Sequence, residues 1–141
     1  MKKPSPTGYS GTPLAKKLGL KGGMRVLEVD APAHFRALIA DAPADVIWLA
    51  RTAPFDFGIA FATSAASVRA AFAKLEPKLA QDGMVWISWP KKASAVKTDL
   101  DENVVREIGL DAGLVDVKVC AIDATWSGLK FVRRLRDRIK S

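Results

Sequence analysis

Two short groups of side chains in this sequence have the chemistry to bind or transform a ligand. Asp30 and His34 stand four residues apart, so they can form an acid–base pair if a helix begins between them. A capping carboxylate beside a histidine at a helix start explains the same spacing, and we favour that structural interpretation. Lys91 and Lys92 directly follow Pro90, which stiffens the chain, so their ammonium groups are either held toward an anionic ligand or simply solvated.

A third group lies in the polar turn DATWSG and contains Thr125 and Trp126. A large aromatic residue in such a turn usually packs against something, and this ring has two candidate partners, a ligand or the end of the hydrophobic core. The complete candidate ligand-binding set is Asp30, His34, Lys91, Lys92, Thr125 and Trp126.

Known catalytic and metal-binding patterns are absent from the sequence. There is no Ser/His/Asp triad, phosphate-binding loop or metal-ligand spacing, so no residue set indicates catalysis. Cys120 is the only cysteine, which excludes an intrachain disulfide and a cysteine-based zinc site and is typical of a reducing cytoplasm. We expect Cys120, in the apolar stretch VKVCAI, to be a partly buried residue of a strand.

Length and composition indicate one ordered domain. The chain has 141 residues, of which 49% are hydrophobic, and it contains no repeat or low-complexity segment. We expect a flexible lead over residues 1–11, a single domain over 12–134 and a basic tail over 135–141. No apolar stretch has the length of a signal peptide or a membrane span, so we predict a cytoplasmic protein without a membrane partner.

The net charge of +7 is concentrated at the two ends of the chain. Residues 1–25 carry six basic and no acidic side chains, and residues 130–141 carry six basic side chains and one acidic side chain. Two interpretations stay open: the charges keep solvated ends soluble, or they attract nucleic acid weakly.

Alternating strand and helix patterns predict the elements that must position these residues. Apolar and β-branched segments predict strands over residues 24–29, 46–50, 55–62, 83–89, 114–122 and 129–134. Helical periodicity predicts helices over residues 12–19, 33–41, 64–79 and 99–112. The last two strands are expected to form an antiparallel hairpin, so the whole is an α/β domain with a mostly parallel sheet.

Particular residues predict how these elements begin and which faces they bury. Thr12 and Ser64 are expected to cap the first and third helices, and Asp99 is expected to form a capping box with Glu102. The predicted buried stripe of the third helix is Val68, Phe72, Leu75 and Leu79. The predicted apolar face of strand 114–122 is Val115, Val117, Val119 and Ala121.

Strand order decides where a ligand can bind. In open α/β sheets, ligands bind beyond the carboxyl ends of the strands, so the candidate groups should meet at that edge. The residues that this rule selects are Asp30, His34, Arg51, Thr63, Ser64, 90–92 and 123–127.

Several phrases of the chain resemble class I, S-adenosylmethionine-dependent methyltransferases. The matching segments, from the first strand to the last, are MRVLEVD, FDFGIAFATS, LAQDGMVWIS, VVREIGLDAGLVDVKV and WSGLKFVRR. The resemblance implies a three-layer, Rossmann-like sheet that is mostly parallel and ends in an antiparallel hairpin strand. The chain also resembles a small bacterial family of uncharacterised proteins in the phrases GYSGTPLAKKLG, WPKKAS and CAIDATWSGLKFVRR. That second resemblance implies a reduced form of this fold without an established activity.

The sequence departs from the methyltransferase pattern where the cofactor would bind. In those enzymes a glycine-rich turn after the first strand allows the backbone to approach the cofactor, whereas DAPA stands here. The acidic residue that usually ends the second strand and grips the ribose is also missing, because VIWLA leads to Arg51. Too few residues separate strands 46–50 and 55–62 for a helical crossover, so the second-strand region is shortened and opens the adenosine side of the pocket.

These observations lead to one expected function and two alternatives. We expect a methyltransferase-like domain that has lost standard S-adenosylmethionine binding, has no cofactor, and binds a small anionic ligand at the carboxyl ends of its strands. The alternatives are a divergent S-adenosylmethionine-dependent methyltransferase and a basic module that associates with nucleic acid. The edge strands allow either a monomer or a homodimer.

Overall fold

The computed structural model describes residues 12–138. The flexible lead expected over residues 1–11 and the last three residues of the expected basic tail lie outside this range. The elements, in chain order, are α1 (Leu14–Leu18), β1 (Arg25–Val29), α2 (Phe35–Leu38), β2 (Ile47–Trp48), β3 (Phe55–Phe61), α3 (Ala65–Leu75), the 3-10 helix η1 (Glu76–Lys78), β4 (Leu79–Pro90), α4 (Glu102–Asp111), β5 (Leu114–Ala121), β6 (Trp126–Arg133) and α5 (Leu135–Arg138).

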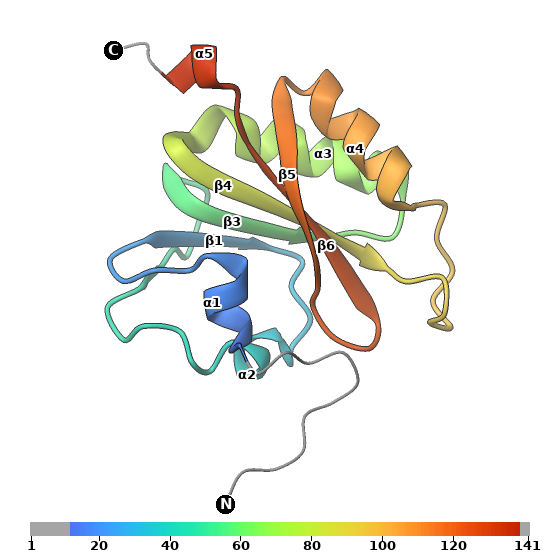
Figure 1. Ribbon diagram of the computed structural model, residues 1–141, viewed down its shortest axis with the longest axis horizontal. Coiled ribbons are helices and arrows are strands. Elements are labelled where there is room, and N and C mark those ends of the chain that lie inside the picture. The colour runs from blue at the N-terminus through green and yellow to red at the C-terminus, as the bar shows by residue number, and fades with distance from the viewer. Residues whose placement is uncertain (1–11, 139–141) are drawn as a thin grey trace, which may run out of the picture.

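Within the described residues, six strands form one sheet in the order β2-β1-β3-β4-β6-β5 (Figure 1). Strands β1 to β4 run parallel, whereas β6 is antiparallel to both of its neighbours, β4 and β5. Strand β2 is a two-residue edge strand, and no helix lies between it and β3. The mostly parallel sheet, the closing hairpin and the shortened second-strand region are therefore confirmed.

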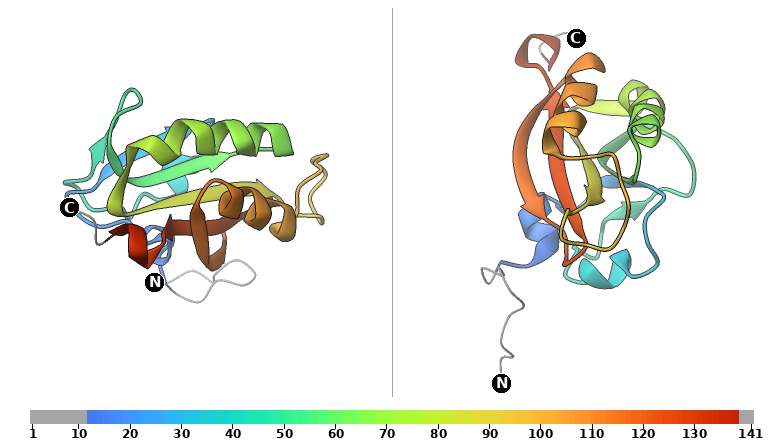
Figure 2. Two further views of the ribbon diagram at one scale, coloured as in Figure 1. Left: turned by 90° about the horizontal axis from the view of Figure 1, so that it is seen from above. Right: turned by 90° about the vertical axis from the view of Figure 1, so that its right-hand side faces the viewer.

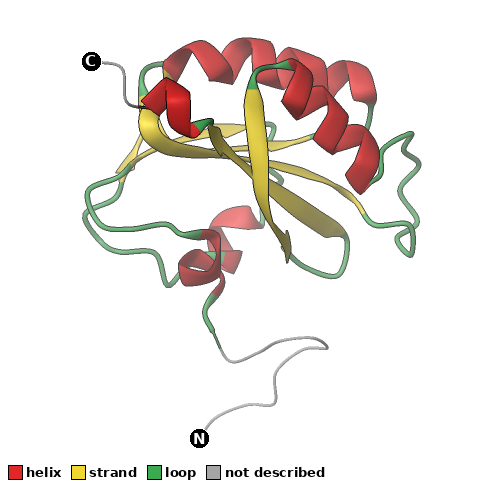
Figure 3. Ribbon diagram, turned by 45° about the horizontal axis from the view of Figure 1, so that its top comes forward, coloured by secondary structure: helices red, strands yellow, loops and turns green. Residues whose placement is uncertain are grey.

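Helices cover both faces of this sheet and give the three layers that the sequence predicts (Figure 3). Helices α3 and α4 lie together on one face, where Phe72, Val85 and Phe131 belong to one buried cluster (Figure 2, left). Helices α1 and α2 lie on the other face over a second cluster that includes Phe57 and Trp86. Among residues 12–138, no helix has the length and apolar character needed to cross a membrane.

Helix α3 follows the prediction at its start and differs at its end. The Ser64 hydroxyl oxygen accepts a hydrogen bond from the Ser67 N–H at 3.1 Å, so Ser64 caps the helix as expected. The helix stops at Leu75 because Pro77 forces the next turn into η1. Leu79, predicted to be on the helix, is instead the buried first residue of β4.

Helix α4 begins at a different cap from the predicted one. The carboxylate of Asp101, and not that of Asp99, accepts a hydrogen bond from the Val104 N–H at 2.9 Å. Asp99 accepts instead from the Ala65 N–H, at 3.0 Å, at the start of α3. The loop before α4 is held there because the Thr98 hydroxyl donates to the carbonyl of Thr63 at 2.6 Å. The capping box was wrong because this tertiary contact takes Asp99 away from its own helix.

The amino-terminal helices are shorter than predicted. Helix α1 ends as expected at Gly19, whose φ of 86° is left-handed, but no side chain caps its start, so Thr12 does not have its predicted role. Helix α2 covers four residues in place of the predicted range 33–41. Asp41, at the end of that range, instead accepts a hydrogen bond from the Ala15 N–H at 3.4 Å. This contact joins the loop after α2 to the start of α1.

Strand β5 presents the opposite of the predicted pattern. Val117 is 54% exposed and Val119 is 46% exposed, whereas Leu114 and Cys120 are buried. The register with β6 shifts between Asp116 and Lys118, and such a bulge exchanges the faces of the residues on its two sides. The predicted apolar face was therefore wrong, although burial of Cys120 is confirmed.

Candidate functional site

The carboxyl ends of the parallel strands bring most of the predicted ligand-binding residues to one edge. Val29 at the end of β1 lies beside Ala60 of β3, and Phe61 lies beside Ser88 of β4. Pro90 at the end of β4 pairs with Trp126 at the start of β6. The turn after β1, the loop after β4 and the β5–β6 turn are thus neighbours, as the topology rule predicts.

His34 pairs across this edge, but with a partner that the sequence did not indicate. Its Nε2 lies 2.9 Å from Oδ2 of Asp123, a residue 89 positions away in the β5–β6 turn. His34 lies at the start of α2, as the favoured interpretation expected, and the alternative pairing with Asp30 is replaced by this contact with Asp123. The contact joins the turn after β1 to the β5–β6 turn.

The carboxylate of Asp123 holds the β5–β6 turn together through several hydrogen bonds. Its Oδ1 accepts hydrogen bonds from the N–H groups of Thr125 and Trp126, both at 2.8 Å. Partial burial raises the pKa of the carboxyl, but the hydrogen bonds from His34 and from the two N–H groups outweigh burial and leave the pKa below its ordinary value. Asp123 is therefore held as a carboxylate that is already fully engaged by the chain itself.

The turn after β1 keeps an unusual backbone shape without glycine. Asp30 has a φ of 56°, and it is the only residue other than glycine with a positive φ in the part of the chain that the structure describes. Its side chain is exposed. The carbonyl of Pro32 then accepts from the Phe35 N–H at 2.9 Å, which starts α2. Aspartate thus occupies a left-handed position that glycine would adopt with less strain.

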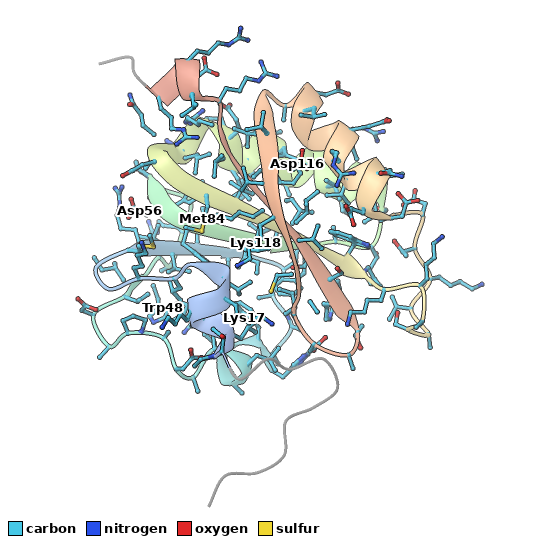
Figure 4. All side chains as sticks on the ribbon, viewed as in Figure 1. Lys17, Trp48, Asp56, Met84, Asp116 and Lys118 are labelled. Atoms are coloured by element: carbon cyan, nitrogen blue, oxygen red, sulfur yellow. The ribbon has the colours of Figure 1, made fainter. Side chains whose placement is uncertain are left out.

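A cluster of side chains that the sequence reasoning missed covers the surface between β1 and β2. The guanidinium of Arg36 makes two hydrogen bonds of 3.0 Å to the carboxylate of Glu28 and lies 3.6 Å from the centre of the Trp48 ring. Arg36 comes from α2, Glu28 from β1 and Trp48, labelled in Figure 4, from β2. The only sequence signal was a tryptophan on a short edge strand. These groups occupy the surface beside the end of β1.

Lys91 and Lys92 differ in how firmly they are held. The Lys91 N–H donates to the carbonyl of Thr125 at 2.8 Å, and the Lys91 carbonyl accepts from the Ser94 N–H at 3.0 Å. Lys91 is half-buried, while Lys92 is exposed. Neither ammonium group forms an ion pair with a carboxylate within residues 12–138.

Trp126 takes one of its two expected roles. Its ring meets Phe61 edge-to-face with centroids 5.1 Å apart, and Phe61 meets Phe35 in the same way at 5.2 Å. The indole therefore closes the end of the core on the α2 face of the sheet. Thr125 enters the site through its backbone, because its N–H and carbonyl are both hydrogen-bonded.

Two hollows of the structure lie away from this edge. One hollow of about 450 Å³ lies between α3 and α4 over Phe72 and Ile108, and another of about 450 Å³ lies near Arg133 at the opposite end of the sheet. Within residues 12–138, no group of three or more acidic, histidine or cysteine side chains is arranged to hold a metal ion.

Comparison with known proteins defines the class of fold. No protein-family model and no curated protein matches the chain. A magnesium protoporphyrin IX methyltransferase from Synechocystis, solved with bound SAH, has a TM-score of 0.59 at 11% identity over 86% of this chain and 78% of that chain. A SAM-dependent methyltransferase from Aquifex aeolicus has a TM-score of 0.58 at 16% identity over 84% of this chain and 86% of that chain.

A third solved structure has a similar fold. The ribosomal protein L11 methylase from Lactobacillus delbrueckii has a TM-score of 0.53 at 14% identity over 86% of this chain and 75% of that chain. At such low identity these similarities establish the fold alone. The chain has the Rossmann-like fold of class I, S-adenosylmethionine-dependent methyltransferases, with a shortened second-strand region.

Proposed function

We propose that this chain is a methyltransferase-like domain that no longer holds S-adenosylmethionine in the standard way and binds a small anionic ligand at the carboxyl ends of its strands. We also propose that it belongs to the small bacterial family that its long phrases resemble. A cytoplasmic location and a monomeric or homodimeric state remain predictions from the sequence. The similarity of fold supports the first half of the proposal, and the geometry at β1 and β2 supports the loss of the cofactor.

The arrangement of Arg36 carries this proposal. Its guanidinium lies over the Trp48 ring and donates two hydrogen bonds to the carboxylate of Glu28. In the methyltransferases that the chain resembles, adenosine rests beside the ends of the first two strands. The shortened second strand was expected to open this side, but the chain's own side chains cover it, and displacing them would break both a charge-assisted pair and a cation–π contact.

The turn after β1 supports the same conclusion from the other side of the cofactor position. Pro32 has no N–H to offer a ligand, and Asp30 adds a carboxylate where the enzymes have glycine. The His34–Asp123 contact, at 2.9 Å, further joins this turn to the β5–β6 hairpin. After Trp48, the chain continues through Ala50 to Arg51 and provides no acidic group for ribose hydroxyls.

Lys91 supports the anionic ligand. Its backbone is held on both sides, its side chain is half-buried, and its charge is not offset by a carboxylate partner within the described residues. The carboxylate of Asp123, the nearest acidic group of the hairpin turn, already has three partners. Lys92 adds a second, exposed ammonium next to it.

Calorimetric titration with S-adenosylmethionine and S-adenosylhomocysteine tests the loss of the cofactor. We expect no heat of binding at millimolar ligand and no change in the melting temperature. Micromolar binding of either compound would contradict the proposal and favour the divergent methyltransferase.

A thermal-shift titration with phosphate, sulfate and citrate tests the anionic ligand separately. We expect the unmodified protein to gain more stability than the variant carrying Lys91→Ala and Lys92→Ala. A control with Lys74→Ala and Lys78→Ala, two exposed lysines near the end of α3, makes the same change in net charge. Equal responses of all three proteins would remove this part of the proposal.

A further inference from the structure

Three lysines form a cluster of like charges on the α1 face of the sheet. We define this lysine cluster as Lys21, which follows α1, Lys118 on β5 and Lys130 on β6. Lys118 and Lys130 are direct cross-strand partners. Figure 4 shows Lys118 on the same side of the sheet as Lys17 of α1, and its ammonium donates to the Lys17 carbonyl at 2.8 Å.

The cluster concentrates like charges without a carboxylate to offset them. Like charges directly opposite each other on neighbouring strands are destabilising. Within residues 12–138, none of the three ammonium groups forms an ion pair with a carboxylate. The carboxylate of Asp116, two residues from Lys118, is instead bonded to Arg106 of α4 on the other face. The carbonyl end of α1 relieves only part of the repulsion, since that helix has a single turn.

Lys130 is the most constrained member of the cluster. It is half-buried and lies across from Trp86 of β4, a fully buried residue whose indole N–H donates to the Leu18 carbonyl. Burial lowers the pKa of the Lys130 ammonium, and repulsion from Lys118 and Lys21 lowers it further. The fold therefore keeps these three positive charges together at a loss of stability.

We propose that the lysine cluster is a binding surface for the phosphate backbone of nucleic acid. The ammonium groups come from three separate parts of the chain, and the sheet holds Lys118 directly opposite Lys130. An extended chain of phosphates can neutralise all three charges at once and release its own counterions. The net charge of +7 and the two lysines in the last turn of α1 add attraction on the same face.

The sequence alone indicated part of this surface. Lys21 and Lys130 belong to the two basic ends, whereas Lys118 comes from the middle of the chain and contacts a residue 101 positions away. Tertiary structure joins one lysine from each of three regions, so the surface has a defined position and the tails are not required for it. The proposal is independent of whether the cofactor site is lost.

Fluorescence anisotropy with a labelled oligonucleotide tests the proposal on the full chain. The cluster variant carries Lys21→Gln, Lys118→Gln and Lys130→Gln. The control variant carries Lys74→Gln, Lys78→Gln and Lys97→Gln, three exposed lysines outside the cluster, with the same change in net charge. We expect the cluster variant to bind at least about tenfold more weakly at low salt, and the slope of log affinity against log salt to fall by about two.

The control variant and competing anions distinguish binding at the lysine cluster from non-specific attraction by the net positive charge. Equal loss of binding in both variants, or no binding by the unmodified protein, would overturn the proposal. It would also be overturned if tripolyphosphate competes as well as an oligonucleotide of equal phosphate content, which would indicate a small-anion site. Cluster-dependent binding to phosphatidylserine vesicles without oligonucleotide binding would indicate a membrane surface instead. A melting temperature of the cluster variant equal to or above that of the unmodified protein would exclude misfolding as the cause of weaker binding.

Discussion

The two halves of this domain differ in the length of their helices and strands. The carboxyl-terminal half, from β3 to β6, contains the eleven-residue α3, the twelve-residue β4 and the ten-residue α4. The amino-terminal half contains the five-residue α1, the four-residue α2 and the two-residue β2. The long helices of the domain therefore belong to its carboxyl-terminal half, and the amino-terminal half is attached through single helical turns.

The two faces of the sheet also differ in packing, because long helices cover one face and short helices cover the other. On the α3/α4 face, Phe72 and Phe131 meet edge-to-face at 5.1 Å between two long helices and the sheet. On the α1/α2 face, the short helices are attached by a few specific contacts, such as the hydrogen bond of 2.9 Å from the Trp86 indole to the Leu18 carbonyl. Long helices can stabilise themselves through many contacts, whereas single turns depend on each one.

Substitution of one phenylalanine on each face should give the largest effect. Phe72 is 2% exposed and Phe35 is 0% exposed, so similar apolar surface is lost in both cases. Phe72→Ala should lower the free energy of unfolding by about 3–5 kcal/mol, because α3 and α4 cannot close the cavity. Phe35→Ala should lower it by less, about 3 kcal/mol or below, because the single turn of α2 can move inward. Urea unfolding measures both; a larger loss for Phe35→Ala would reverse the comparison.

A pair of glycines tests how tightly each half is packed. A Cβ at Gly109 of α4 would lie 2.1 Å from Cε2 of the buried Phe131 ring, so Gly109→Ala should lower the free energy of unfolding by about 1–3 kcal/mol despite better helix propensity. Gly19→Ala meets no atom closer than 3.4 Å and should lose only about 1 kcal/mol from its left-handed backbone. Thermal melts of the two variants provide the measurement, and a harmless Gly109→Ala would show that α4 packs loosely.

The contact between the two halves at the candidate site should depend on pH. Asp123→Asn should lower the free energy of unfolding by about 1 kcal/mol at neutral pH, since it weakens the bonds to His34 and to two N–H groups. The pKa of Asp123 is lowered by folding, so its stabilisation is present above the unfolded pKa of about 3.9 and is lost as pH falls through the folded pKa. The difference between the two proteins should therefore shrink in acid. A constant difference from neutral pH to strong acid would show that the carboxylate charge does not matter.

The smallest effect concerns the turn after β1. Asp30→Gly should change the free energy of unfolding by no more than about 0.5 kcal/mol, because glycine gains freedom in the unfolded chain while the left-handed strain at a φ of 56° disappears. Asp30→Ala keeps that strain and should lose about 1 kcal/mol. Neither variant should bind S-adenosylmethionine by calorimetry, because the Arg36–Trp48 contact remains. Binding restored by Asp30→Gly alone would place the defect entirely in the turn.

Sequence patterns predicted best where one residue's neighbours decide its structure. The continuous apolar runs of β3 and β4 need cover on both faces, and both strands are indeed central in the sheet. Ser64 caps α3 with a residue three positions ahead, so the local pattern was sufficient. Prediction failed at Asp99 and at Val119, because a cap contact with another helix and a bulge on an edge strand arise only after packing.

Sequence patterns were sufficient to predict the order of the main strands and helices, the missing glycines of the first turn and the shortened second strand, but not η1 or α5. Those features depend on residue types at fixed local spacing. Only the tertiary structure decided that His34 pairs with Asp123, that Arg36 covers Trp48 and that Lys118 joins Lys130 beside α1. Each of these contacts depends on which strands lie side by side and which face each side chain takes. A pattern with a period of two or 3.6 residues carries no information on contacts between residues that are 89 or 101 positions apart.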